Sequence, residues 1–141
     1  MGQADSPYLQ AWHLFIGEGG QLSTDRAAVR VTVGALRSGR VRLIVPEGLD
    51  LAPDVAAKIA AYVGEAVLIA REYPDAFRPM PEQRGVTSVG ATMAGMVRVS
   101  IPEDLDMAPQ LAEAIARHIA EAATTANMVR QDAGPTQLQE G

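Results

Sequence analysis

The chain has 141 residues, of which 48% are hydrophobic and 21% are charged. This balance excludes wholesale disorder, and the length favours one small domain with its own core. Aromatic residues make up only 4% and cysteine is absent, so the core must be aliphatic, and disulfides, iron–sulfur clusters and thiol catalysis are excluded. The net charge of −5 argues against broad nonspecific attraction to nucleic acid or anionic membranes.

Two further features of the composition concern source and location. Arginine supplies every basic residue except Lys58, and alanine is abundant, which is typical of proteins encoded by GC-rich bacterial genomes. No apolar run approaches the roughly 20 residues that span a bilayer, and the first residues lack a basic segment followed by an apolar one. We therefore expect a cytoplasmic protein that makes no contact with membranes.

Residues 1–28 form an amino-terminal segment in which we expect an extra strand. From Trp12 to Ile16, large apolar residues alternate with others, and a glycine-rich stretch follows at 17–20. A period of two predicts a half-buried strand, with a short helix as the alternative. The glycines lack the order and the lysine of a phosphate-binding loop, so we interpret them as a turn.

The most specific pattern is an internal repeat with an offset of 56 residues. Residues 33–70 align without a gap on residues 89–126, and 18 of these 38 positions are identical. This identity exceeds chance even in an alanine-rich chain, so the sequence predicts a duplication. The two units span residues 29–72 and 86–130, with a proline-rich crossover at 73–85 between them.

Each unit is expected to form a β-hairpin followed by a helix. Apolar residues alternate with polar ones on both sides of the turns at 37–40 and 94–95. Helical spacing then follows in two apolar stripes, Val55, Ile59, Val63 and Ala66 in the first unit and Leu111, Ile115, Ile119 and Ala122 in the second. These patterns predict helices over about residues 51–72 and 107–130, and a flexible tail at 131–141.

The helix starts carry matching signals in the two units. Asp50 and Asp106 each stand three residues before a proline, Pro53 and Pro109. We interpret each aspartate as a helix cap and each proline as a first-turn residue, where the missing N–H costs little. The acidic loops also suggest a metal site, but they lack the spacing of an EF-hand, and capping explains them; their members are Glu47, Asp50, Glu103, Asp104 and Asp106.

The expected fold is therefore α+β: duplicated ββα units form a four-stranded antiparallel sheet, or a five-stranded one with the extra strand, and both helices pack on one face. One domain contains all of these parts. The opposite face and the sheet edges would be uncovered, which favours a homodimer that protects them. The residues that we propose for partner or nucleic-acid binding on this face are Arg30, Thr32, Arg42, Arg98 and Ser100.

Alternating arginine with threonine or serine on a β-ribbon can contact bases in the DNA major groove. The segment VRVSIPEDL resembles the strand of the ribbon-helix-helix regulators, and SGRVRLIVPEGL resembles the strand and turn of AbrB-type regulators. Each resemblance covers about a dozen residues and implies a DNA-binding role. The long single helix of each unit departs from the two helices of the first family and from the further strand of the second.

Catalysis requires a nucleophile, a base or a metal cluster, and the sequence offers no recognisable set. We expect His13 to pack at the edge of the core and His118 to flank the second helix. Tyr62 and His118 occupy equivalent repeat positions and are the ligand candidates for a cleft between the units. No cofactor and no metal is predicted.

The sequence thus favours a non-enzymatic protein-binding or assembly module, homodimeric, that works through the exposed sheet face or a sheet edge. Its partners would be a second copy and another protein. A DNA-binding regulator that uses the arginine face is the first alternative. A small-molecule-binding protein or enzyme with a cleft between the repeats is the second.

Overall fold

A computed structural model describes residues 7–25, 28–72, 87–102 and 106–140 of the chain. The protein is α+β, as predicted. Its elements in chain order are β1 (Tyr8–Ile16), the 3-10 helix η2 (Glu18–Gly20), β2 (Val29–Leu36), β3 (Val41–Ile44), β4 (Asp50–Leu51), α1 (Pro53–Ala70), β5 (Ser88–Ala91), β6 (Val97–Ser100), β7 (Asp106–Met107) and α2 (Pro109–Glu140).

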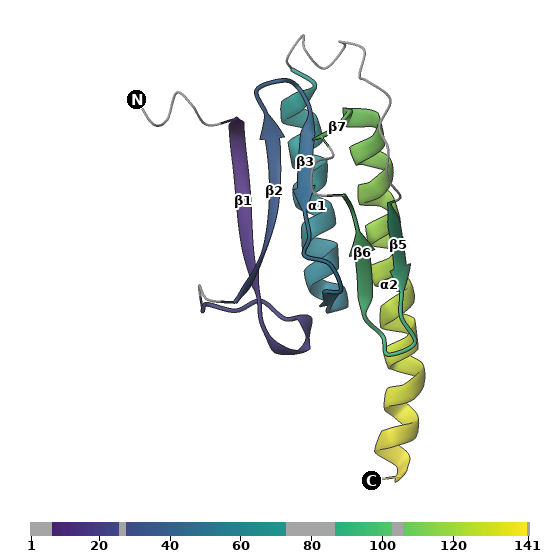
Figure 1. Cartoon of the computed structure of the whole chain (residues 1–141). Coiled ribbons are helices and arrows are strands. Elements are labelled where there is room, and N and C mark those ends of the chain that lie inside the picture. Colours follow the sequence, from purple (N-terminus) through teal and green to yellow (C-terminus); the bar gives the residue numbers. More distant parts are fainter. Residues whose placement is uncertain (1–6, 26–27, 73–86, 103–105, 141) are drawn as a thin grey trace.

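The strands form two antiparallel sheets, so the prediction of a single sheet is wrong. One sheet has the order β1-β2-β3-β7 and the other the order β4-β6-β5. The reason is that β3 and β6 pair with short strands and not with each other: β7 pairs with β3, and β4 pairs with β6. Each short strand therefore follows one hairpin in sequence and extends the other. Both sheets lie on the same side of the two helices (Figure 1).

The two hairpins and the extra strand are confirmed. β2 pairs with β3, and β5 pairs with β6, each in antiparallel register. The turns contain Gly39 and Gly95 at φ +83° and +77°, a backbone conformation that glycine adopts without steric cost. β1 pairs with β2 from Tyr8 opposite Leu36 to Ile16 opposite Val29, and the register shifts once, between Tyr8 and Gln10.

The core lies between the strands and the helices, and it is aliphatic as the composition requires. The predicted stripe of α1 is buried, and so are Ile115, Ile119 and Ala122 of α2, whereas Leu111 is 37% exposed and lies outside the core. The inner faces of the strands contribute Val31, Val33, Val41, Leu43, Leu51, Val97, Val99 and Met107. Buried alanines on both helices, among them Ala56, Ala60, Ala112 and Ala123, let the helices pack closely.

The helix boundaries correct one prediction and extend another. Pro53 is the first residue of α1, as predicted, but the residue before it, Ala52, is the N-cap and no side chain caps the helix there. Asp50 lies in β4 instead, so its predicted capping role is wrong. α2 continues through the expected tail to Glu140. Among the described residues, no helix combines the length and the apolar character needed to cross a membrane.

Several predictions concern residues that lie outside the described part of the chain. These are the crossover at 73–85 and the acidic residues Glu103 and Asp104.

Candidate functional site

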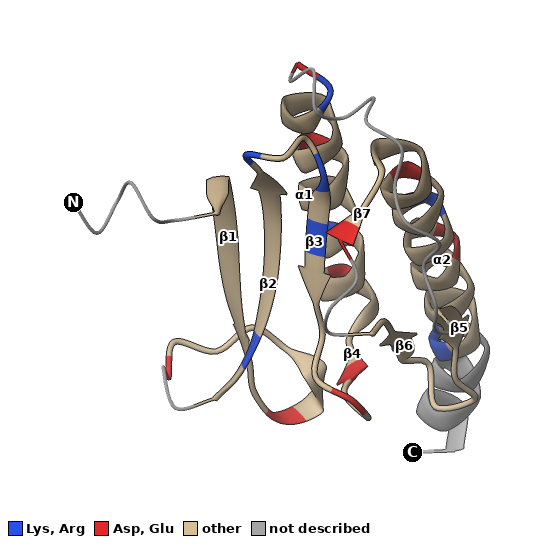
Figure 2. Cartoon of the chain, turned by 45° about the horizontal axis from the view of Figure 1, so that its top comes forward, with Lys and Arg blue, Asp and Glu red and all other residues tan. Residues whose placement is uncertain are grey.

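Arg42, a predicted binding residue, is held by a carboxylate from the other unit. Its Nε donates to Asp106 Oδ1 at 2.7 Å and its Nη2 donates to Asp106 Oδ2 at 2.9 Å. Figure 2 shows this basic position of β3 directly beside the acidic position of β7. The two side chains are 28% and 30% exposed. This hydrogen bonding raises the pKa of the Arg42 guanidinium above its usual value, so the group stays charged.

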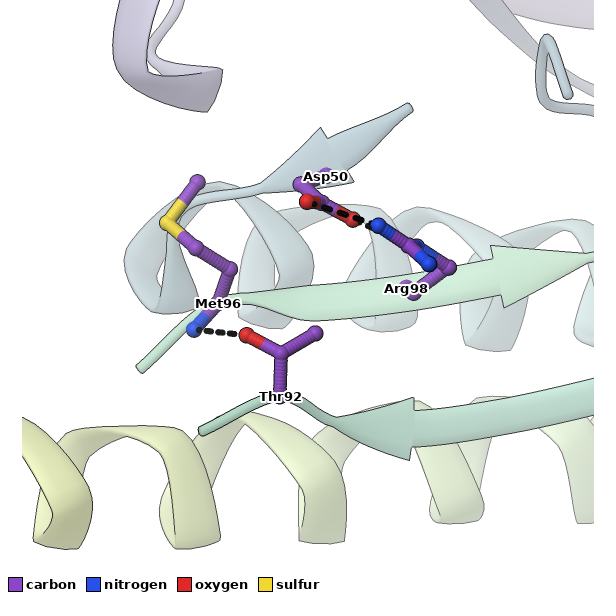
Figure 3. Close-up of polar contacts among 4 residues, drawn as sticks. All are labelled: Asp50, Thr92, Met96 and Arg98. Carbon is purple, nitrogen blue, oxygen red and sulfur yellow. Dashed lines mark hydrogen bonds and ion pairs between the residues drawn. The ribbon is translucent and has the colours of Figure 1, made fainter. Parts of the chain in front are cut away.

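Arg98 of the second unit forms the same two-point ion pair with a carboxylate of the first unit. Its Nε donates to Asp50 Oδ1 at 2.6 Å and its Nη2 to Asp50 Oδ2 at 3.0 Å (Figure 3). The hydrogen bonds from Arg98 lower the pKa of the Asp50 carboxyl below its usual value of 3.8. Residues 42 and 98 are 56 positions apart, and so are residues 50 and 106. Each hairpin therefore binds the aspartate that follows the other hairpin.

Tyr8 covers the outer sheet face next to Arg42. The Arg42 guanidinium carbon lies 5.7 Å from the centroid of the Tyr8 ring. A Cβ added to Gly34, which is paired with Arg42 between β2 and β3, would overlap this ring. The absence of a side chain at Gly34 thus makes room for Tyr8. This part of the face is occupied by the chain itself.

The other face residues are dispersed. Arg30 and Ser100 are exposed, in different sheets. Thr32 is buried, 4% exposed, and its Oγ1 lies 3.0 Å from Nδ1 of His13 on the neighbouring strand. His13 is itself exposed, so its expected position at the edge of the core is wrong. The five candidates therefore lie on one side of the strands without forming a cluster of free cations.

The two ligand candidates lie in different surroundings. The Tyr62 ring stacks on Trp12 of β1, with centroids 5.5 Å apart and planes 20° apart. His118 is exposed on α2, where its Nδ1 lies 3.4 Å from Glu121 Oε1. Of the two grooves beside α1 that the described residues form, one includes Tyr62 and neither includes His118. Among the described residues no cluster of His, Asp and Glu suits a metal ion.

A second candidate surface is the outer edge of β1, an example of the uncovered sheet edges that the sequence predicts. β1 is the terminal strand of its sheet, and a short segment touches its outer edge near one end, where Ile16 bridges Leu22. The Ser23 N–H donates to the Phe15 carbonyl at 2.7 Å, so the backbone of residue 15 faces outward. Strand groups alternate in direction, and the N–H and C=O groups of Ala11 and His13 therefore also face outward. Within the described part of the chain no strand pairs with this stretch.

An exposed face of α1 lies beside this edge. Lys58, Glu65 and Leu68 are exposed there, and Tyr62 is half-buried at the centre. Leu68 is 66% exposed and adds apolar surface to this face. Two shallow grooves run between β1 and α1. One, of about 380 Å³, includes His13, Lys58 and Tyr62, and the other, of about 320 Å³, includes Trp12, Glu65 and Leu68.

We call the outward edge of β1 from Tyr8 to Leu14, together with this α1 face, the β1 edge surface. No protein-family model, curated protein or solved structure matches the chain. Lys58, Glu65 and Leu68 could not be singled out from the sequence, because each is an ordinary residue for the exposed part of a helix. One signal was present: residues 58, 62, 65 and 69 follow helical spacing along one flank of the buried stripe.

Proposed function

We propose that the chain is a non-enzymatic protein-binding or assembly module, homodimeric, that works by adding a strand at the β1 edge surface. The observation that carries this proposal is the nine-residue terminal strand β1, whose outward backbone groups at Ala11 and His13 have no strand partner among the described residues. Such an edge is a template for strand addition, because backbone hydrogen bonds supply affinity that is independent of side-chain identity. Trp12 and Leu68 add apolar area beside it.

The edge is a better candidate than the sheet face. On the face, Arg42 and Arg98 already bind carboxylates, and Tyr8 covers Gly34. These pairings neutralise the arginines that a DNA-binding regulator would use, and the net charge of −5 adds repulsion from phosphate. A ligand cleft between the units is less favoured, because Tyr62 stacks on Trp12 of β1 whereas His118 is exposed on α2 beside Glu121. These observations favour the edge over the arginine face and over a cleft that contains Tyr62 and His118.

We further propose that the two units arose by duplication of one ββα unit. The identity of 18 of 38 aligned positions supports this origin, as do the two arginine–aspartate pairs at positions offset by 56. A single ββα unit would expose the hairpin edge that the short strand of the other unit now covers. Self-association of that unit would have covered the same edge.

The experiment that tests the proposed function replaces one outward-facing N–H. Ala11→Pro removes a donor that points away from β2, a substitution that edge strands tolerate. We expect light scattering to give a dimer for the wild type and a monomer for Ala11→Pro, with unchanged circular dichroism. Ala11→Thr keeps the N–H and should remain dimeric. A folded Ala11→Pro variant that stays dimeric would contradict the proposal.

Hydrogen exchange provides a second measurement that needs no variant. The amides of Ala11 and His13 should exchange slowly in concentrated protein and faster on dilution, because they are bonded only in the dimer. Amides that face β2, such as that of Trp12, serve as the internal control. Exchange that does not depend on concentration at Ala11 and His13 would count against strand addition.

A further inference from the structure

The β1 edge surface has charges placed symmetrically about its centre. Trp12 is the middle residue of β1, which spans residues 8–16, and its ring stacks on Tyr62. Lys58 lines the groove on the His13 side of this stack, and Glu65 lines the groove on the Gln10 side. α1 therefore runs opposite to β1 across the surface, with one positive and one negative side chain on either side of the aromatic pair.

Lys58 and Glu65 are also free to bind elsewhere. Neither makes an ion pair or a hydrogen bond in the described part of the chain, and both are exposed. They stand seven positions apart along α1, or about 10 Å at 1.5 Å per residue. The midpoint of the two falls between Ala61 and Tyr62, and Ala61 is an exposed small residue that allows close approach.

We infer that the partner on this surface is a second copy of the chain, docked about a twofold axis that passes near Trp12, with Lys58 of each subunit facing Glu65 of the partner subunit. This inference rests on the proposed function and specifies its partner and register. A twofold axis makes an interface from the same patch on both subunits. Such a patch must be self-complementary, and the arrangement of one cation and one anion about a central aromatic pair meets this condition.

The backbone permits the same register. In antiparallel pairing centred on residue 12, Ala11 of each strand lies opposite His13 of the partner subunit, and these are the residues whose backbone groups face outward. Trp12 then meets Trp12 of the partner subunit at a position without cross-strand hydrogen bonds, where side chains approach most closely. Gln10 lies opposite Leu14 of the partner subunit, which brings the Glu65 side of one subunit to the Lys58 side of the other.

Charge reversal tests this register directly. Lys58→Glu alone places two acids opposite each other at both ends of the interface, and Glu65→Lys alone places two bases there. We expect each single variant to weaken the dimer about tenfold or more, since two attractions become two repulsions. The double variant Lys58→Glu with Glu65→Lys restores opposite charges and should dimerise like the wild type. Mixing the two single variants should give a heterodimer, detected by native mass spectrometry.

Matched controls separate this effect from net charge. Arg117→Glu makes the same change of charge as Lys58→Glu at an exposed position of α2, and Glu72→Lys matches Glu65→Lys beyond the end of α1. Both controls should dimerise like the wild type. A dimeric wild type whose single variants behave like the controls would overturn this register and leave the proposed function standing. A monomeric wild type at high concentration would overturn both.

Discussion

Arg42 of the first hairpin forms a two-point ion pair with Asp106, which follows the second hairpin, at 2.7 and 2.9 Å. The pair of Arg98 with Asp50 repeats this relationship in the other direction. Because each pair joins segments more than 45 residues apart in sequence, at separations of 64 and 48, the pairs lock the two units to each other. Leu51 and Met107 follow these aspartates in β4 and β7, and both are fully buried in the core.

The two arginines should differ in their effect on stability. Arg42 is less exposed than Arg98, with side-chain exposures of 28% and 57%, and it also packs over Tyr8. We expect Arg42→Ala to lower the free energy of unfolding by about 1–2 kcal/mol and Arg98→Ala to lower it less, because water screens an exposed pair. Urea unfolding of both variants measures the difference. An equal or larger loss for Arg98→Ala would contradict the ranking.

Asp50 gives the fold a defined dependence on pH. Its pKa is lowered in the folded chain by hydrogen bonds from Arg98, relative to the usual value of 3.8. The stabilisation is therefore fully present above that value and is lost as the pH falls through the lower, folded pKa. The stability of the Asp50→Asn variant should therefore fall less than that of the wild type as the pH decreases below 3.8. Thermal unfolding across a pH series measures this difference. If the pH profiles of variant and wild type run parallel there, the assignment to Asp50 is wrong.

Gly20 of η2 packs closely against the backbone that leads into α1. The Ala52 N–H donates to the Gly20 carbonyl at 3.1 Å, and a Cβ on Gly20 would overlap the backbone of residues 50 and 52. Gly19 has a similar φ, +69° against +71°, but open space around it. Gly19→Ala should therefore cost only the backbone term of about 1–2 kcal/mol, and Gly20→Ala clearly more. Equal unfolding free energies for the two variants would show that the overlap is relieved.

Gly34 offers a similar comparison on the sheet face. Gly90 occupies the equivalent position 56 residues later. A Cβ added to Gly34 would overlap the Tyr8 ring, whereas a Cβ added to Gly90 would meet open space. We expect Gly34→Ala to cost about 1–3 kcal/mol, because the ring must leave Arg42, and Gly90→Ala to be tolerated. Adding Tyr8→Ala should make Gly34→Ala tolerated as well. A double-mutant cycle by urea unfolding measures this coupling, and a coupling near zero would argue against the packing of Tyr8 on residue 34.

The hairpins and both helices were predictable from the sequence because their patterns are local. Alternation around residues 37–40 marks a hairpin, and the stripe from Val55 to Ala66 marks a helix whatever the rest of the chain does. The two short strands were not predictable, since two residues carry no period. Asp50 and Asp106 resembled caps because they precede prolines, but their partners are arginines of the other unit, which only the assembled fold brings near.

The candidate site was likewise predictable only in part from the sequence. Arg42 and Arg98 were identified as members of one face, but their neutralisation by aspartates depends on contacts distant in sequence. Lys58 and Glu65 escaped notice because each is an ordinary exposed helical residue. They gain meaning only beside the open edge of β1, and the order of the strands in the sheet determines which edge is open.

The molar mass of the wild-type protein in solution tests the central claim most directly. Sedimentation equilibrium over a range of concentrations should give twice the chain mass of 14.9 kDa at high concentration. The dimer should dissociate on dilution, as expected for an interface formed by one strand and one helix face. A mass of 14.9 kDa at every concentration would contradict the proposed homodimer.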